Sequence, residues 1–496
     1  MQEQSNRSRN LSRVGRHICG VVFFCAAMAI ASQAQFTKLA DLTPTTGEFP
    51  HSPLVQGLDG NLYGTTSNYG AYGGGTFFQL TPSGTVTTLY DFCFNDNPGC
   101  PDGAEPSGVV VLGSDGSFYG TTIGSLTGGE DSTIYKITTG GSLTTLHTFC
   151  GAPSCSGAFA SSDGLALAWN GNFYGTSFPP DGSSAYDNLV YSVTPTGTAH
   201  TRLIVCPNQL CPTDAGPGGA LLQSSGGYLI GPGPGGANNA GAIYRMTPLG
   251  SPSVIYSMCV DSSCHLGTGT TSPLVQNPAG NLLGTNRAGG AGPFCTIGGG
   301  CGNVFQLIGS AYTEMHSFCN WPSCVDGAQP NALIRASDGN FYGTTLSGGS
   351  KGAGVVFKIT PWHAYSVIHQ FLGPEGGNPE TALMQATDGT LYGTTISGGS
   401  HTGGNEQGTI FKISLGLPPF IKTVQPAGKV GDTILILGNG LTGSTSVTFN
   451  DTSASFTVVS DTQISATVPS GATTGAIEVV TPSKTLLTLG VFPVHM

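Results

Sequence analysis

The sequence predicts an all-β protein: a seven-bladed β-propeller closed by an N-terminal strand and followed by an immunoglobulin-like β-sandwich. Three observations lead to this fold class. The 496 residues include 78 glycines and 32 prolines but only 9% charged residues, which disfavours long helices. A segment built around Tyr-Gly-Thr recurs seven times at a spacing of about 55 residues, with Ile230-Gly231-Pro232 and Leu283-Gly284-Thr285 in place of the tripeptide in two copies. After the last copy cysteine disappears, and short runs of Val, Ile and Thr alternate with Gly-containing turns.

Residues 1–34 are expected to be a signal peptide. Four arginines precede an uncharged stretch from Ile18 to Ala31, and Ser32-Gln33-Ala34 fits a cleavage site, with an uncleaved anchor as the alternative. Loss of this leader removes four arginines and one glutamate, so the formal net charge falls from −11 to −14. We therefore expect a secreted, periplasmic or cell-surface protein after cleavage near Ala34, with no membrane insertion and no nucleic-acid partner.

Each of the seven copies contains four extended runs. A short apolar strand such as Ala332–Arg335 leads through an Asp-Gly turn, expected to be of type I′, into the Tyr-Gly-Thr strand. A Gly-rich loop then precedes a third strand with alternating polarity, such as Val355–Thr360, and a fourth, such as Leu143–Phe149. Four antiparallel strands repeated at this length are typical of a propeller blade, with a solenoid as the main competitor. The motif glycines are Gly64, Gly120, Gly175, Gly231, Gly284, Gly343 and Gly393.

The two ends of the repeat region favour a closed ring over a solenoid. The third strand of the seventh copy, Thr409–Ile413, runs into Leu417-Pro418-Pro419 without a fourth strand. Phe36–Leu42, before the first copy, has the fourth-strand pattern. We expect these two segments to pair, because an open solenoid would need caps instead. The predicted propeller domain spans residues 35–417.

Twelve cysteines of the mature chain form six close pairs along the sequence. Their spacing lacks C-x2-C and a regular histidine companion, so nearest-neighbour disulfides are expected, and neither a metal nor a cofactor. Loops this short gain only about 2 kcal/mol per bridge, which suits exposed loops rather than a core. The expected pairs are Cys93/Cys100, Cys150/Cys155, Cys206/Cys211, Cys259/Cys264, Cys295/Cys301 and Cys319/Cys324.

Residues 338–371 read Asp-Gly-Asn-Phe-Tyr-Gly-Thr-Thr, a Gly-rich loop, Val-Val-Phe-Lys-Ile-Thr-Pro and Ile-His-Gln-Phe. Over residues 36–415 this pattern resembles the GloVer family of bacterial tandem-repeat proteins. That resemblance implies an exported or surface protein and no particular activity. Residues 418–496 resemble an IPT/TIG domain, through Gly431–Gly440, Val447–Phe449 and Val468–Ala472. This second resemblance implies an immunoglobulin-like spacer or adhesion module.

The loops between the second and third strands and the connections between blades should emerge on one face of the propeller. We call it the loop-rich face, and we expect it to carry all six cysteine pairs and the binding surface. Solubility and protection from proteolysis are the alternative explanation of these loops. The predicted function is an exported, non-enzymatic binding, adhesion or scaffold protein. It is expected to be a monomer with an extracellular ligand, either a glycan or a protein.

The alternative function is an extracellular carbohydrate-active enzyme, a hydrolase or lyase with acids near the propeller axis. It would require ionisable residues from different blades to meet within about 10 Å. No catalytic residue is predicted. His147, His316 and His369 share one column of the fourth strand, where other copies carry apolar or aromatic residues, so packing explains them. The Asp-Gly turns explain their acids, which are Asp59, Asp115, Asp338 and Asp388.

Overall fold

The structure is a computed structural model that describes residues 34–495 except for ten internal gaps. The described ranges are 34–94, 100–124, 132–149, 159–160, 164–178, 189–204, 219–233, 241–258, 272–295, 300–399 and 407–495. Ala34–Met496 form one compact unit. The predicted signal peptide lies, except for Ala34, outside the described residues. No helix in the described ranges is both long and apolar enough to cross a membrane.

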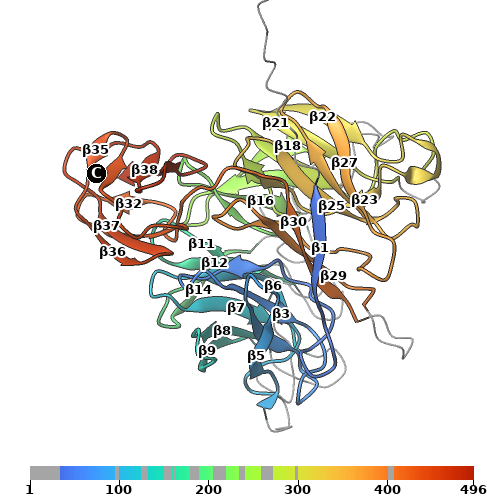
Figure 1. Cartoon of the computed structure of the whole chain (residues 1–496), viewed down its shortest axis with the longest axis horizontal. Helices are drawn as coiled ribbons and strands as arrows, with labels where there is room; N and C mark the ends of the chain where they lie inside the picture. Colours follow the sequence, from blue (N-terminus) through green and yellow to red (C-terminus); the bar gives the residue numbers. More distant parts are fainter. Residues whose placement is uncertain are drawn as a thin grey trace, which may run out of the picture. The chain divides into compact units, whose positions relative to one another are not determined.

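Seven antiparallel sheets follow one another along the chain (Figure 1). Blade one contains β2 (Val55–Gln56), β3 (Leu62–Thr66), β4 (Thr76–Leu80) and β5 (Val86–Asp91). Blade two contains β6 (Pro106–Leu112), β7 (Phe118–Thr122), β8 (Thr133–Ile137) and β9 (Leu143–Thr148). Blade three contains β10 (Phe159–Ala160), β11 (Ala166–Leu167), β12 (Phe173–Phe178), β13 (Leu189–Val193) and β14 (Ala199–Ile204).

The remaining blades repeat this order. Blade four contains β15 (Leu222–Gln223), β16 (Leu229–Gly233), β17 (Ala242–Met246) and β18 (Pro252–Ser257). Blade five contains β19 (Val275–Gln276), β20 (Leu282–Asn286), β21 (Asn303–Ile308) and β22 (Ala311–Ser317), and a 3-10 turn, η4 (Pro322–Cys324), follows it. Blade six contains β23 (Ala328–Pro330), β24 (Ile334–Arg335), β25 (Phe341–Ser347), β26 (Val355–Ile359) and β27 (Tyr365–Gln370). Blade seven contains β28 (Met384–Gln385), β29 (Leu391–Thr395), β30 (Thr409–Ser414) and, from the start of the described chain, β1 (Gln35–Asp41).

The N-terminal strand closes the ring. β1 pairs antiparallel with β30, with Phe36 opposite Ile413 and Thr37 opposite Lys412. Figure 1 shows β1, in blue, beside β30, in orange. The packing agrees with this pairing, because Leu54 of blade one and Ile410 of blade seven share one buried cluster. The predicted seven-bladed propeller and its closure are therefore confirmed.

Each blade buries both faces of its sheet against its neighbours. A buried apolar cluster lies between every neighbouring pair of blades, from one and two through to seven and one. Between blades six and seven, for example, Val356 and Phe371 pack against Phe411. A propeller of this kind has no single core, and its stability depends on all seven contacts between blades.

In blade six, the Tyr-Gly-Thr motif connects the strands of the blade to one another and to blade seven. Gly343 pairs directly with Phe357, and a Cβ at Gly343 would lie 2.6 Å from Cζ of that ring, so no larger residue fits without a shift. The Tyr342 hydroxyl donates to Asp338 Oδ2 at 2.9 Å within the blade. Thr344 Oγ1 donates to the carbonyl of Thr381 in blade seven at 3.0 Å. The motif thus has a structural explanation at each of its positions.

Two details differ from the sequence-based expectations. The prediction of type I′ turns is wrong, because Gly60 has φ of 82° while Asp59 is not among the residues with positive φ. The Gly57 N–H donates to the Asn61 carbonyl, so the loop has three residues and a single left-handed glycine. The innermost strand of blade six is also shorter than expected: only Ile334–Arg335 pairs within the predicted strand 332–335.

The C-terminal region is an immunoglobulin-like sandwich. One sheet has the order β31 (Lys422–Thr423), β33 (Thr433–Leu437), β37 (Gln463–Thr467) and β36 (Phe456–Ser460). The other has the order β35 (Thr452–Ser453), β34 (Ser446–Phe449), β38 (Ile477–Val480) and β39 (Thr485–Leu487). A short parallel pair joins β32 (Gly428–Lys429) to β40 (Val494–His495). Leu437 lies in the buried cluster of blades one and two, and Thr462 Oγ1 donates to the Leu58 carbonyl in the first turn of blade one at 2.7 Å.

Candidate functional site

A small pocket lies where the innermost strands of the blades begin. Its volume is about 190 Å³, and six of the seven blades contribute residues to it. Most of its lining residues directly precede an innermost strand, so the pocket surrounds the propeller axis on the loop-rich face. We call it the axial pocket. Its lining residues are His51, Pro53, Gly108, Val109, Ala220, Ser272, Pro273, Arg287, Asn331, Ala332, Glu380, Thr381 and Ala382.

His51 and Glu380 form a hydrogen-bonded pair in this pocket. His51 Nδ1 lies 2.8 Å from Glu380 Oε2. Both residues follow a proline and lie four positions before the innermost strand, His51 in blade one and Glu380 in blade seven. Ring closure makes these blades neighbours, so two equivalent positions meet. The hydrogen bond from His51 lowers the pKa of the Glu380 carboxyl below its ordinary value, although burial opposes this effect.

Arg287 approaches the same carboxylate from blade five. Its Nη2 lies 3.9 Å from Glu380 Oε1 and 3.3 Å from Asn331 Oδ1. Asn331 is only 3% exposed, and its Nδ2 donates to the Pro379 carbonyl at 2.6 Å and to Thr344 Oγ1 at 3.0 Å. Because the amide group is held at both donors, its oxygen is directed at Arg287. Blades five, six, seven and one together build this charged wall.

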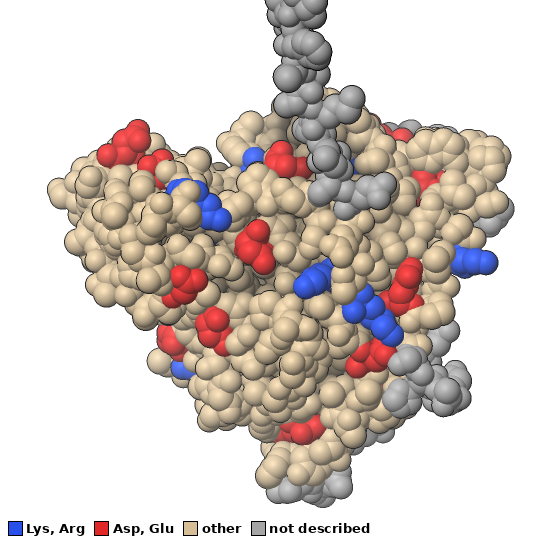
Figure 2. Space-filling model, viewed as in Figure 1, with Lys and Arg blue, Asp and Glu red and all other residues tan. Residues whose placement is uncertain are grey.

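The charged residues of the axial pocket depart from the repeat. Arg287 immediately follows β20, and the other six copies carry uncharged residues at this position of the sequence, namely Ser67, Ile123, Phe178, Pro234, Leu346 and Ile396. At the position of His51 and Glu380, blade two has Ser107. Sheet formation therefore does not require these charges. Figure 2 shows that charged side chains are few on the visible face of the molecule.

Sequence reasoning missed His51, Arg287 and Glu380. The signal that would have found them is a comparison of the copies for charged residues that only one or two of them carry. The alternative hypothesis of a carbohydrate-active enzyme required ionisable groups from different blades to meet near the axis, and His51 and Glu380 lie 2.8 Å apart there.

The predicted fourth-strand histidines lie elsewhere. The His316 ring stacks on Tyr365 with centroids 3.8 Å apart, and the His369 ring stacks on Phe36 at the same distance. Their Nε2 atoms lie 3.2 Å from Asp326 and 3.1 Å from Glu375, respectively. Burial lowers the pKa of both His147 and His369, more strongly than Glu375 raises that of His369. These side chains pack the outer strands, as the sequence suggested, and do not line the axial pocket.

The acids of the Asp-Gly turns are used within their blades. Asp59 Oδ2 accepts from the Tyr63 hydroxyl at 2.8 Å, and Asp388 Oδ1 accepts from the Thr390 N–H at 2.8 Å. Asp115 lies 2.6 Å from Lys136 Nζ, and Asp338 lies 3.3 Å from Lys358 Nζ. Burial alone would raise the pKa values of Asp115 and Asp338, but hydrogen bonds and the lysine charges lower them. Their contacts explain these residues without a ligand.

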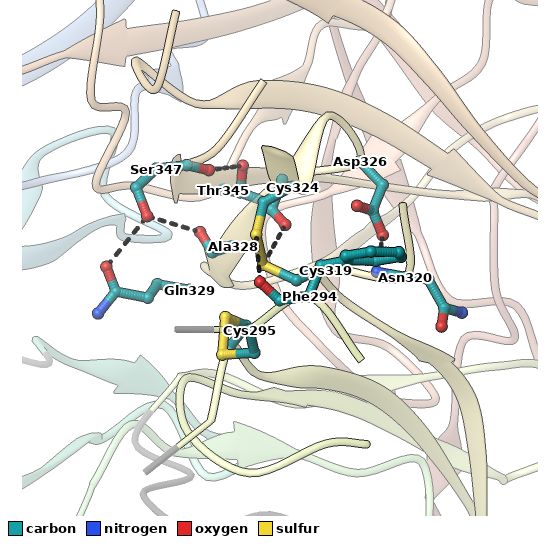
Figure 3. Close-up of a disulfide and its surroundings, with 12 residues drawn as sticks. Phe294, Cys295, Cys319, Asn320, Cys324, Asp326, Ala328, Gln329, Thr345 and Ser347 are labelled. Atoms are coloured by element: carbon teal, nitrogen blue, oxygen red, sulfur yellow. Dashed lines mark hydrogen bonds between the residues drawn. A yellow bond between two sulfur atoms is a disulfide. The ribbon is translucent and has the colours of Figure 1, made fainter. Parts of the chain in front are cut away.

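Three disulfides lie in the described loops. Cys93–Cys100 lies within the connection from blade one to blade two, and Cys319–Cys324 lies within the connection from blade five to blade six. Cys295–Cys301 lies in the loop between β20 and β21. The Sγ atoms of Cys295, Cys301 and Cys319 are all within 4.8 Å of one another, and Figure 3 shows Cys295 beside the Cys319–Cys324 bridge. Because Cys295 is bonded to Cys301 and Cys319 to Cys324, these three sulfurs are not thiolate ligands for a metal. The expected pairs that involve Cys150, Cys155, Cys206, Cys211, Cys259 and Cys264 lie outside the described residues.

Comparison with known protein families identifies both parts of the chain. The Gloeobacter/Verrucomicrobia repeat matches residues 12–178 and 295–441, which is more than half of the sequence. The chain belongs to this repeat family. The IPT/TIG domain matches residues 419–491. Both resemblances noted from the sequence are thereby confirmed. No curated protein matches this member of the Gloeobacter/Verrucomicrobia repeat family.

Among solved structures, the fold of this family member is similar to that of a fungal alcohol oxidase in complex with copper. The two share 12% identity with a TM-score of 0.50, and the match covers 93% of this chain and 99% of the oxidase. At this identity the likeness concerns the fold alone. A putative glucose dehydrogenase from Thermus thermophilus matches at 14% identity and a TM-score of 0.39, covering 77% of this chain and 100% of that one. The extracellular domain of a putative hybrid two-component system from B. thetaiotaomicron matches at 9% identity and a TM-score of 0.44, covering 94% and 60%.

Proposed function

We propose that this repeat-family member is an exported binding protein that holds its ligand on the loop-rich face of the propeller, over the axial pocket. The observation that carries this proposal is the convergence of His51, Arg287 and Glu380 on one pocket, at positions where the repeat needs no charge. A leader-like N-terminus and paired cysteines support export. In this proposal the IPT/TIG domain acts as a spacer or adhesion module, and the protein is a monomer.

A binding screen tests the proposal directly. The chain from Gln35 onward, labelled at one terminus, is applied to arrays of glycans and of extracellular proteins. Each ligand found is then measured again with Arg287→Met and with Glu380→Gln. Arg245→Met is the matched control, because Arg245 is an exposed arginine on β17 that does not line the axial pocket. Ligands that bind both pocket variants as tightly as the wild type would contradict the proposal.

One observation favours a second candidate, a carbohydrate-active enzyme. His51 and Glu380 come from different blades and meet at 2.8 Å, well inside the distance of about 10 Å that the enzyme hypothesis requires. A histidine that is oriented by a carboxylate is a common general base. Incubation with a panel of polysaccharides, followed by measurement of new reducing ends and unsaturated products, distinguishes the candidates. Product release that His51→Gln abolishes would favour the enzyme, and intact polysaccharides would favour the binding protein.

A further inference from the structure

Arg287 has hydrogen-bonding capacity left for a ligand. Its Nη2 contacts Asn331 and approaches Glu380, whereas its Nε and Nη1 hydrogen-bond none of the described residues. The side chain is 40% exposed in the axial pocket, although Asn331 directs it. A guanidinium presents its N–H groups as a planar fork that matches the two oxygens of a carboxylate. This arginine is therefore positioned to bind an anionic group.

The charge of the neighbouring groups limits which anion fits. Glu380 is ionised at neutral pH, since its ordinary pKa is already acidic and the hydrogen bond from His51 lowers this pKa further. Its negative charge offsets the positive charge of Arg287, to which it lies 3.9 Å away. One further negative charge on the ligand would leave a small net charge, whereas a dianionic phosphate would be repelled by Glu380. The wall thus favours a carboxylate over a phosphate.

The shape of the pocket and its other polar groups define the rest of the ligand. Glu380 also offers an acceptor, so a matching ligand needs hydroxyl donors as well as an anionic group. The facing wall is uncharged in its described part and consists of small residues, including Gly108, Val109 and Ala220. The volume of about 190 Å³ lies below the range of roughly 300–1,000 Å³ that is typical of larger organic ligands. Such a pocket holds a small molecule or one end unit of a longer chain.

We infer that the axial pocket binds a uronic acid unit, alone or at the end of a polysaccharide. The sugar carboxylate is held by the Arg287 guanidinium, and ring hydroxyls hydrogen-bond to Glu380 and His51. A uronic acid carries both the carboxylate and the hydroxyl donors that this wall requires. The inference rests on the proposed function and adds to it the chemical class of the ligand.

Calorimetric titration of the chain from Gln35 onward tests the ligand class. D-galacturonate and D-glucuronate are compared with their neutral parents, D-galactose and D-glucose. We expect at least one uronate to bind about tenfold or more tightly than its neutral parent. Arg287→Met should weaken uronate binding by a similar factor and leave the neutral sugars unchanged. Arg245→Met should leave all four affinities unchanged, and melting curves establish that each variant is folded.

Glu380→Gln tests the role of charge. Removal of this negative charge should let D-galactose 6-phosphate bind more tightly to the variant than to the wild type, while Arg287→Met should not have this effect. Equal affinity for uronates and neutral sugars, unchanged uronate binding in Arg287→Met, or no uronate binding at 10 mM ligand would each overturn the inference. The uronate inference can fail while the proposed function holds: this is the outcome if the glycan and protein arrays identify a neutral glycan or a protein whose binding needs Arg287 or Glu380. If no ligand depends on these residues, the proposed function fails as well.

Discussion

At the scale of single residues, the conserved pattern of the repeat and the exceptions to it have different explanations. Gly343 is a glycine because the Phe357 ring lies against it, and Tyr342 and Thr344 are polar because they bond to Asp338 and to blade seven. Arg287, which has no counterpart in the other copies, instead lines the axial pocket. Residues that repeat build the blades, and charged residues that do not repeat are candidates for binding.

Gly343→Ala should destabilise the propeller by about 1–3 kcal/mol, because the added methyl group forces the Phe357 ring away from its packed position. Chemical denaturation measures this change in the free energy of unfolding. Gly140→Ala is the control, since Gly140 has no heavy atom closer than 3.8 Å to an added Cβ. The control should change stability by less than about 0.5 kcal/mol. Equal effects of the two substitutions would contradict the packing explanation of the motif.

Glu380 should make stability depend on pH in the acidic range. Its pKa in the folded protein lies below its ordinary value of 4.5, so the folded state binds this proton less readily than the unfolded state does. The stabilising contribution is therefore complete above about pH 4.5 and is lost as the pH falls through the lower, folded-state pKa. Unfolding free energies of the wild type and Glu380→Gln should converge as the pH falls below this range. A difference that stays constant down to pH 3 would exclude this linkage.

At the scale of elements, β1 is the strand on which ring closure depends. Deletion of Phe36–Leu42 should leave the edge of β30 unpaired and exposed. It should also remove the stacking contacts that Phe36 makes with His369 and Phe411. We expect a fall in melting temperature of about 10 °C or more. A synthetic peptide of residues 35–42 should restore part of the loss by adding back the strand, whereas a scrambled peptide should not. An unchanged melting curve after the deletion would be incompatible with the closed ring.

The disulfides are predicted to join loops on the ligand-binding side. Reduction of the oxidised chain from Gln35 onward should raise its mass by about 12 Da if all six bridges form, since each bridge takes up two hydrogens. Peptide mapping should find Cys295 linked to Cys301 and Cys319 to Cys324. Reduction should lower the melting temperature only modestly, because each short loop contributes about 2 kcal/mol or less. Twelve free thiols before reduction would contradict the prediction.

Element order was predictable from the sequence, but fine geometry was not. The pattern around Phe36 and Ile413 indicated the closing pair because strand polarity and chain order are local properties. The turn type was not predictable, because Asp-Gly suits both a two-residue turn and a three-residue loop that ends in a left-handed glycine. The innermost strands of blades six and seven pair over only two residues each, and the carbonyls of Asn331 and Thr381 just before them accept hydrogen bonds from the preceding blades.

At the scale of the whole molecule, the candidate site follows from closure of the ring. His51 and Glu380 lie near opposite ends of the repeat region and become neighbours only because blades one and seven meet. Arg287 reaches them across Asn331 of blade six. A sequence pattern locates each residue in its own copy but does not give the side-chain directions at the axis. The number, order and closure of the blades could therefore be predicted, while the pocket could not.

The contact between the propeller and the IPT/TIG domain should couple their unfolding. Leu437 of β33 is 1% exposed and belongs to the buried cluster of blades one and two rather than to the core of its own sandwich. Leu437→Ala should therefore weaken the contact by about 2–4 kcal/mol, and a single melting transition should separate into two. Leu487 is an exposed leucine of β39, so Leu487→Ala is the matched control and should leave one transition.

The contact with the IPT/TIG domain lies away from the axial pocket. The Leu58 carbonyl accepts a hydrogen bond from Thr462 of the domain and lies in the short turn between the first two strands of blade one. The axial pocket lies at the opposite ends of these inner strands. Ligand affinity should consequently be unchanged in both variants, and a loss of affinity in Leu437→Ala alone would show that the domain contributes to the binding face.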